Sequence, residues 1–290
     1  MPPSPRDTSW TIMREAADLT GLDADGAQLV SQSSRVMWRL PRSHVALAIT
    51  RPHTRTRDQV FGEAKAVHAA TTAGVRTPPL LIGPTMLPGG RFALGYSWVD
   101  GRRITSTRAW QQTVAEAAKL ANAPTAHLPA VRVELDVPRR QWIDVLGPSL
   151  IMAFTSAWDN AAQTLATLIE PGDLVLAHGD LSPANMLVDR QGEGWLIDFE
   201  YASLAPREWD AAKVLILSHR FGDPVDPEYL LSAWPHLDGA RLAECVRVQE
   251  VLIIGWLVQM AIRGTLDAAA EARTRAQGLL NSGHAWRHLR

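Results

Sequence analysis

Short apolar runs separated by polar turns fill the first third of the chain. Runs of this kind predict strands, and apolar side chains at helical spacing predict helices. The strand-like runs lie at residues 28–30, 36–40, 45–50, 80–82 and 92–99. Helical spacing appears at residues 10–19 and 61–73. The pattern therefore predicts an antiparallel five-stranded sheet accompanied by helices.

Beyond residue 106 the pattern becomes mostly helical. The helical segments lie at residues 110–123, 151–168, 206–219, 230–234, 243–262 and 267–280. Residues 124–148 hold several prolines and scattered charges, and the pattern leaves their course open. The chain thus predicts an α+β fold with two lobes. A sheet lobe spans residues 1–97, a linker spans 98–101 and a mostly helical lobe spans 102–290.

One stretch inside the helical part predicts strands instead. Its three apolar runs lie at residues 174–177, 186–188 and 195–199. The turn between the last two holds Gly and charged residues, so these runs predict a β-hairpin. A hairpin brings its two open ends together. The sequence therefore predicts that Asp180, Asn185 and Asp198 share one edge.

Two carboxylates and an amide on one edge suit a hard divalent cation. Mg²⁺ usually takes one or two carboxylates and leaves its other positions to waters and phosphates. Phosphoryl transfer uses the same trio: an Asp orients and deprotonates the attacking hydroxyl, while an Asn and an Asp hold the metal. We therefore predict Asp180 as the catalytic residue and Asn185 and Asp198 as Mg²⁺ ligands. The chain holds no motif of a serine hydrolase or a zinc protease.

The spacing of these residues is that of a kinase catalytic loop. His178, Asp180 and Asn185 follow the H-x-D-x-x-x-x-N pattern, and Asp198 with Phe199 supplies the later D-F pair. The stretch from His178 to Glu200 resembles the aminoglycoside phosphotransferase family of small-molecule kinases. In that family the loop is close to HGDLxxxN and the metal segment is close to IDFE.

This resemblance implies a bilobal protein-kinase-like fold, with a nucleotide-binding lobe followed by a helical lobe that carries the catalytic loop and the acceptor site. It implies ATP or GTP as the phosphoryl donor, together with Mg²⁺. His178 and Asp210 stand where the family places residues that support the catalytic loop. Helix capping is the alternative role for Asp210.

The resemblance also implies a nucleotide site in the first lobe. Ser33 and Ser34 lie in the first hairpin loop, which covers the nucleotide phosphates in kinase-like folds; an ordinary polar loop is the alternative. The family pairs a basic residue on the third strand with a Glu on the next helix. No lysine precedes Lys65, so Arg51 is the nearest replacement to pair with Glu63, or else a solvated residue at the strand end.

The linker completes the expected nucleotide site. Ser97 and Val99 stand where the resemblance places backbone groups that contact the base. A strand that simply ends at Asp100 and Gly101 is the alternative.

Composition narrows the partners and the compartment. The formal net charge of -1 gives no reason to expect nucleic acid or an anionic membrane surface. The single Cys245 excludes an internal disulfide, and the N-terminus has no apolar segment typical of a secretory signal. The longest apolar run, residues 251–262, is shorter than the roughly 20 residues that span a bilayer. We expect a cytoplasmic monomer or homodimer whose partners are a nucleotide and a hydroxylated small molecule.

The acceptor is the least constrained part of the prediction. Residues 221–290 hold 8 acidic and 7 basic side chains, which favours a neutral or partly anionic acceptor over a polycation. We expect an antibiotic that is O-phosphorylated, as in resistance enzymes. Two alternatives stay open: a kinase of a primary metabolite such as choline, homoserine or a sugar, and a nucleotide-binding module that has lost catalysis.

Overall fold

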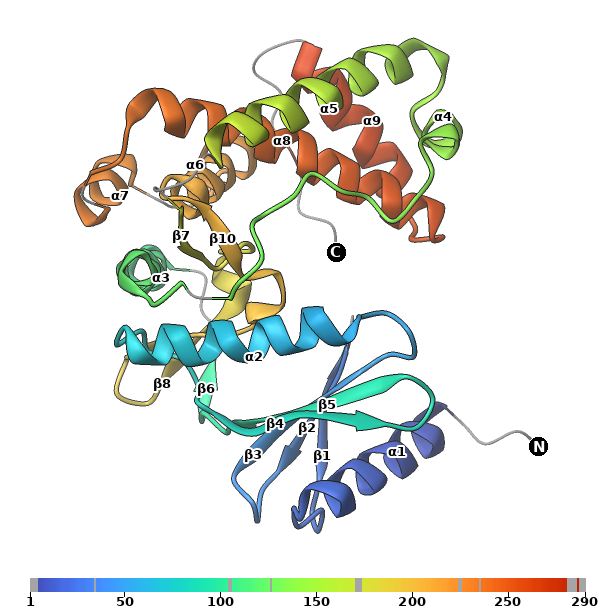
Figure 1. Cartoon of the computed structure of the whole chain (residues 1–290), viewed down its shortest axis with the longest axis vertical. Coiled ribbons are helices and arrows are strands. Elements are labelled where there is room, and N and C mark those ends of the chain that lie inside the picture. The colour runs from blue at the N-terminus through green and yellow to red at the C-terminus, as the bar shows by residue number, and fades with distance from the viewer. Residues whose placement is uncertain are drawn as a thin grey trace.

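The structure is a computed structural model of the chain. It has the predicted α+β fold, with a five-stranded antiparallel sheet in the N-terminal part and a helical C-terminal part (Figure 1). The residues that it describes are 5–33, 35–103, 106–125, 127–169, 174–223, 226–234, 236–280 and 286.

The five strands begin at or next to the predicted runs, and the fourth continues five residues beyond its predicted end at residue 82. They are β1 (Gln28–Gln32), β2 (Arg35–Leu40), β3 (Val45–Thr50), β4 (Leu80–Leu87) and β5 (Arg91–Ser97), in the order β1-β2-β3-β5-β4. Side chains alternate between the two faces of a strand. Trp38 of β2 and Leu47 of β3 therefore join one apolar cluster, while Met37 and Ala48 join another on the opposite face.

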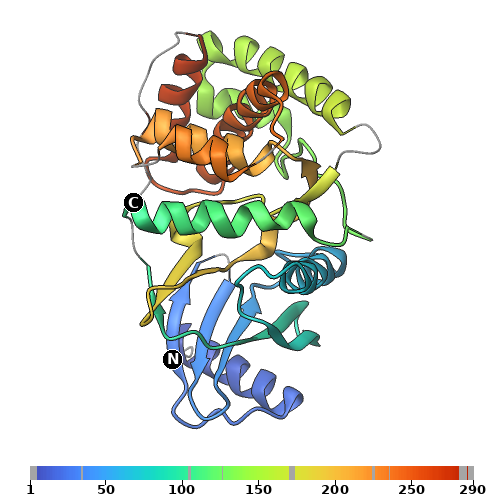
Figure 2. The same ribbon diagram turned by 90° about the vertical axis from the view of Figure 1, so that its left-hand side faces the viewer.

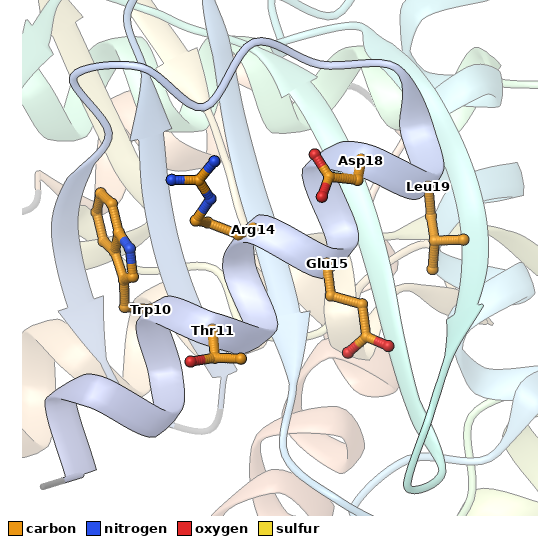
Figure 3. Close-up of a pocket in the computed structure, with 6 residues that line it drawn as sticks. All are labelled: Trp10, Thr11, Arg14, Glu15, Asp18 and Leu19. Carbon is orange, nitrogen blue, oxygen red and sulfur yellow. The ribbon is translucent and has the colours of Figure 1, made fainter. Parts of the chain in front are cut away.

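Helix α1 (Pro5–Thr20) covers the first of these faces. Its buried Met13, Ala16 and Ala17 pack in the cluster that contains Trp38 and Leu47. The other side of α1 faces outward, and Figure 3 shows six of its residues around a shallow pocket. This pocket lies on the α1 side of the sheet.

Helix α2 (Arg57–Thr72) covers the second face, between the sheet and the C-terminal part (Figure 1). It begins four residues before the predicted start. The cause is a capping box, in which Thr56 accepts a hydrogen bond from the backbone N–H of Gln59 and the Gln59 side chain accepts one from the N–H of Thr56. Glu63 is thus in the second turn of the helix, where its side chain is buried against the sheet.

Two small sheets connect the large sheet to the helices. In one, β6 (Gly101–Arg102) pairs with β8 (Met186–Asp189), which pairs in turn with β9 (Gly194–Leu196). The β8–β9 pair is the predicted hairpin. In the other, β7 (Leu174–Ala177) pairs with β10 (Ser203–Pro206).

Strand β10 was missed by the sequence analysis. Pro206 was expected to open a helix, but it is the last residue of this strand and lies opposite Leu174. A proline is tolerated at such a position because a strand at a sheet edge does not need every backbone N–H group. Helix α6 (Trp209–Phe221) begins three residues later.

The remaining helices form the C-terminal part. They are α3 (Thr107–Lys119), α4 (Trp142–Leu146), α5 (Pro148–Leu168), α7 (Pro227–Ala233), α8 (Gly239–Ile262) and α9 (Ala268–Leu280). Figure 2 shows α3 crossing the molecule between the large sheet and the other helices. In the segment of unpredicted course, Pro129 and Val131 form backbone hydrogen bonds with Leu204 of β10 before the chain reaches α4.

Helix α8 is the one described helix long and apolar enough to cross a membrane, and half of its most apolar window is buried. Its buried side chains, among them Val248, Ile254 and Leu257, belong to the main apolar cluster. Core helices of soluble proteins have the same length and composition, so α8 is weak evidence for a membrane span.

Candidate active site

The loop after β7 carries the predicted catalytic residues, and α6 supports it. The backbone N–H groups of His178 and Gly179 donate to the two carboxylate oxygens of Asp210, at 2.7 and 3.1 Å. Asp210 is buried, and burial raises the pKa of its carboxyl group although these hydrogen bonds oppose the shift. Asp210 therefore holds the backbone of the loop, and the described residues form no side-chain capping hydrogen bond at the start of α6.

His178 is buried beneath the same loop. Its Nδ1 is 3.4 Å from the backbone nitrogen of Asp180, and its Nε2 is 2.9 Å from the carbonyl oxygen of Ile197. These partners assign the proton to Nε2, because the backbone nitrogen of Asp180 is a donor and the carbonyl of Ile197 is an acceptor. The ring also packs on Phe199, with 4.8 Å between ring centroids. His178 thus ties the loop to the segment that carries Asp198.

Gly179 is required by the close approach of two segments. Its φ angle is +81°, and a Cβ atom built there would lie 2.3 Å from the carbonyl oxygen of Tyr201. Only glycine adopts this conformation without strain and leaves that space free. The glycine brings Asp180 close to the turn that follows Asp198.

Asp180 has a different partner on each carboxylate oxygen. Its Oδ1 lies 3.3 Å from Nζ of Lys213 on α6, and its Oδ2 accepts a hydrogen bond of 2.9 Å from the side-chain amide of Asn185. Burial raises the pKa of Asp180, but the charge of Lys213 and the hydrogen bonds outweigh it and hold the pKa below its ordinary value. The carboxylate is therefore ionised and oriented before any substrate binds.

Asn185 lies directly before β8, and Asp198 lies two residues after the end of β9. The backbone N–H of Ile197 donates to the carbonyl of Asn185 at 2.9 Å, which places Asp198 one residue beyond this pair. The predicted strand 195–199 ends earlier, because β9 stops at Leu196 and Asp198 adopts the left-handed conformation, with φ of 69°. The structure thus brings Asp180, Asn185 and Asp198 to the shared edge that the hairpin predicted.

The oxygens at this edge fit a hard cation. The amide nitrogen of Asn185 donates to the backbone oxygen and to Oδ2 of Asp180, so its own side-chain oxygen is available as a ligand. Burial and the charge of Asp198 raise the pKa of the neighbouring Glu200, and the charges of Arg35 and Arg55 oppose this shift. No three His, Cys, Asp or Glu side chains gather into a metal site among the described residues, and Mg²⁺ does not need three when phosphates supply ligands.

The prediction that Arg51 pairs with Glu63 is wrong. Glu63 pairs with Arg35 of β2 at 2.7 Å and with Arg55, and it accepts a hydrogen bond of 2.5 Å from the hydroxyl of Tyr96. Arg51 is exposed, and its Nε donates to the carbonyl of Ser33. The reason is strand parity: Ile49 of β3 packs on the α1 face, and Arg51, two residues on, continues on that side, away from Glu63.

Arg35 connects the sheet to Asp198. Its second guanidinium nitrogen lies 2.7 Å from Oδ1 of Asp198, whose side chain is 31% exposed. Arg55 also donates to the backbone carbonyl of Glu200. The basic residue that pairs with Glu63 thus comes from β2, whereas the sequence predicts it on β3. The alternation of side chains within RVMWRL indicates this position of Arg35, because Arg35 falls on the face of β2 opposite Trp38.

The other predicted nucleotide contacts have ordinary backbone roles in this structure. The N–H of Ser33 donates to the carbonyl of Arg35, and the N–H of Ser97 donates to the carbonyl of Pro79. Val99 is half-buried in the connection between β5 and β6. Ser34 lies outside the described residues. These assignments stay predictions.

Comparison with known proteins identifies related kinases. The model of the phosphotransferase enzyme family matches residues 27–243. No curated protein sequence matches the chain. An amicoumacin kinase in complex with AMP-PNP and Ca²⁺ has a TM-score of 0.73 at 14% identity, covering 96% of both chains.

Two further solved structures have the same fold. A microcompartment-associated aminopropanol kinase has a TM-score of 0.69 at 19% identity, over 92% of this chain and 94% of the other. A choline kinase from Streptococcus pneumoniae has a TM-score of 0.64 at 16% identity, over 94% and 99%. At these identities the likeness establishes the kinase-like fold, as predicted.

Proposed function

The chain belongs to the phosphotransferase enzyme family, and we propose that it transfers the γ-phosphoryl group of ATP or GTP to a hydroxyl group of a small molecule, with Mg²⁺. The observation that carries this proposal is the edge shared by Asp180, Asn185 and Asp198. A protein that only bound a nucleotide would not need an ionised carboxylate held at that edge.

In this proposal residues 1–97 hold the nucleotide, residues 98–101 join the lobes, and residues 102–290 carry catalysis and the acceptor site. Asn185 and Asp198 would hold Mg²⁺, which neutralises phosphate charge when bound. Arg35 stands beside Asp198 with its guanidinium already oriented by Glu63. It is the cation best placed to contact the phosphates of the donor.

Asp180 acts on the acceptor. An acceptor hydroxyl that donates to its carboxylate is oriented toward the γ-phosphorus, and its proton passes to Asp180 as the new P–O bond forms. Positioning and electrostatic stabilisation supply most of the rate enhancement in such a reaction. The low pKa of Asp180 suits this role, because a loose transition state needs an oriented acceptor more than a strong base.

We propose an antibiotic as the acceptor class. Solved structures with a similar fold include kinases of amicoumacin and spectinomycin, and kinases of aminopropanol and choline. A kinase of a primary metabolite is therefore the alternative. The two differ only in the acceptor, and the shared catalytic edge does not separate them.

A catalytically silent module is less well supported. It was considered because the third strand has no lysine, yet Arg35 from β2 supplies a buried cation paired with Glu63. The loop also carries Asp180, whose pKa is held below its ordinary value so that the carboxylate is ionised.

The test is transfer to a panel of hydroxylated compounds. Antibiotics, choline, homoserine and sugars are incubated with the protein, Mg²⁺ and either ATP or GTP, and mass spectrometry detects the gain of one phosphate. We expect one acceptor class to gain phosphate. Bound nucleotide with no gain on any compound would favour the silent module instead.

Two variants serve as controls in this assay. Asp180→Asn should keep nucleotide affinity and lower kcat by roughly 10²- to 10⁴-fold. Asp198→Ala should lose the part of nucleotide affinity that depends on Mg²⁺, measured by calorimetry with and without the metal. Unchanged turnover in Asp180→Asn would remove that residue from its assigned role.

A further inference from the structure

Helix α6 presents two side chains to the catalytic loop. Asp210 holds the backbone of His178 and Gly179, and Lys213 lies one turn further along and reaches Asp180. Residues three apart are neighbours on one face of a helix, so the same face of α6 contacts three successive loop residues. The sequence predicts a role for Asp210 and none for Lys213.

Lys213 is unusually placed for a lysine. The chain has only three lysines, and the exposed Lys65 and the half-exposed Lys119, which pairs with Glu116, lie away from this loop. The Lys213 side chain is 17% exposed, and its ion pair within the described residues is with Asp180. Lysines are rarely covered to this extent unless their charge is matched.

We propose that Lys213 is a further catalytic residue, which donates a hydrogen bond to the transferring phosphoryl group while it holds Asp180. This inference rests on the function proposed above. In the structure the Oδ2 atom of Asp180 contacts Asn185, a proposed metal ligand, and the Oδ1 atom contacts Lys213.

The distances around Asp180 allow Lys213 to contact the phosphoryl group. The acceptor oxygen must come within about 3 Å of the Asp180 carboxylate, and the phosphorus within about 3–3.5 Å of that oxygen in a reactive geometry. Nζ of Lys213 is itself 3.3 Å from Oδ1 of Asp180. An ammonium group has three donors on a flexible stem, so it can contact the carboxylate and a phosphoryl oxygen together.

In the transfer step Lys213 acts only as a hydrogen-bond donor. The acceptor oxygen forms a bond to the γ-phosphorus and gives its proton to Asp180. The bond between that phosphorus and the bridging oxygen breaks, and its electron pair leaves with the nucleoside diphosphate. Lys213 keeps its protons throughout. Its positive charge stabilises the negative oxygens of the phosphoryl group in transit.

The purely structural alternative makes a different prediction. If Lys213 only neutralised Asp180, its loss would alter stability and loop order without a specific effect on transition-state binding. A mimic of the transferring phosphoryl group separates the two, and it needs no knowledge of the acceptor. ADP with aluminium fluoride and Mg²⁺ is such a mimic, and ADP with Mg²⁺ alone is its reference.

The experiment compares the full chain with Lys213→Met, Lys213→Arg and the control Lys119→Met. We expect Lys213→Met to bind ADP within about twofold of wild type, but to bind ADP–aluminium fluoride more than tenfold more weakly. Removal of one donor to a developing charge typically costs about 10²-fold in kcat, and the same loss in kcat with little change in KM for the donor should appear once an acceptor is found. Lys213→Arg should recover part of both, and Lys119→Met should match wild type.

Each outcome decides the proposal. Equal loss of ADP and ADP–aluminium fluoride affinity in Lys213→Met, or no loss of either, would overturn it, and so would a Lys213→Arg variant no better than Lys213→Met. Should Lys213→Met fail to fold, Lys213→Arg decides alone: a transition-state-mimic affinity and kcat equal to those of a neutral Lys213→Gln would count against the proposal. Wild type that binds no ADP would instead refute the proposed function, and this inference with it.

Discussion

The buried carboxylate of Glu63 offers the sharpest test of how the sheet is joined to the catalytic part. Glu63 is 2% exposed, and its side chain contacts two guanidinium groups, from Arg35 and Arg55, and the hydroxyl of Tyr96. Glu63→Gln keeps the size and shape of the side chain but removes its charge. Two cations would then be left at a buried position with no carboxylate from α2.

The magnitude follows from the pKa of this carboxyl group. Burial alone would raise it, but Arg35 and Arg55 outweigh burial and lower the pKa of Glu63 from its ordinary 4.5 to about 2. A difference of this size corresponds to about 3 kcal/mol of folding free energy at neutral pH. Breaking a buried ion pair by removing one partner costs a similar 3–5 kcal/mol. For a chain of this length, about 3 kcal/mol lowers Tm by about 5 °C.

The pH dependence has a fixed sign. Because the pKa of Glu63 is lower in the folded state, its contribution to stability is fully present above pH 4.5 and is lost as the pH falls toward 2. The difference in free energy of unfolding between wild type and Glu63→Gln should therefore stay constant from neutral pH down to about 5. Below that it should shrink.

Urea unfolding followed by circular dichroism, from pH 7 to the lowest pH at which wild type is folded, measures this difference. Glu134→Gln is the matched control, because Glu134 makes the same kind of pair with Arg132 but both side chains are about 70% exposed. The control should change Tm by less than about 1 °C, since exposed pairs contribute little. A Glu63→Gln variant as stable as the control, or a difference that grows on acidification, would refute the reasoning.

The sequence predicts that Asp180, Asn185 and Asp198 lie together because their meeting depends on local chain geometry. A hairpin of known strands must bring its ends together, so Asp180, Asn185 and Asp198 meet whatever surrounds them. The five strands of the large sheet were predicted for the same reason, since alternation and turns are local signals. The start of α2 was missed because its capping box lies in a polar stretch that apolar spacing does not mark.

The cation that pairs with Glu63 could not be predicted in the same way. Choosing Arg51 assumed that the basic residue must come from the third strand, whereas Arg35 reaches Glu63 from the neighbouring strand. Which of two adjacent strands supplies a side chain depends on register and on the side chain's length. Arg35 pairs with Thr50 across β2 and β3, so the two strands place equivalent positions side by side.

Lys213 was missed for a related reason. Its contact with Asp180 joins residues 33 positions apart in sequence, and no motif spans that distance. The signal for Lys213 in the sequence is the position of Asp210 at the start of α6. A helix that holds the loop at one residue also faces the loop one turn later. Contacts between an element and a distant loop become predictable only after one of them is fixed.

Two further predictions test the geometry around the loop. Gly179→Ala should lower stability by more than about 1–2 kcal/mol and displace Asp180, because the residue has a positive φ angle and its Cβ would meet the carbonyl of Tyr201; thermal melts and kcat measure this, and Gly239→Ala, where a Cβ meets nothing, is the control. The second concerns which arginine serves the nucleotide. Arg35→Met should weaken binding of ATP with Mg²⁺ by about tenfold or more, because charge-assisted hydrogen bonds of this kind contribute about 1.5–3 kcal/mol, whereas Arg51→Met should stay within about twofold. Calorimetry under conditions where both variants are folded makes the comparison. Arg35 contacts Asp198 at the metal edge and Arg51 contacts Ser33 on the other face of the sheet, so equal losses in the two variants would mean that the nucleotide lies over the first hairpin rather than beside Asp198.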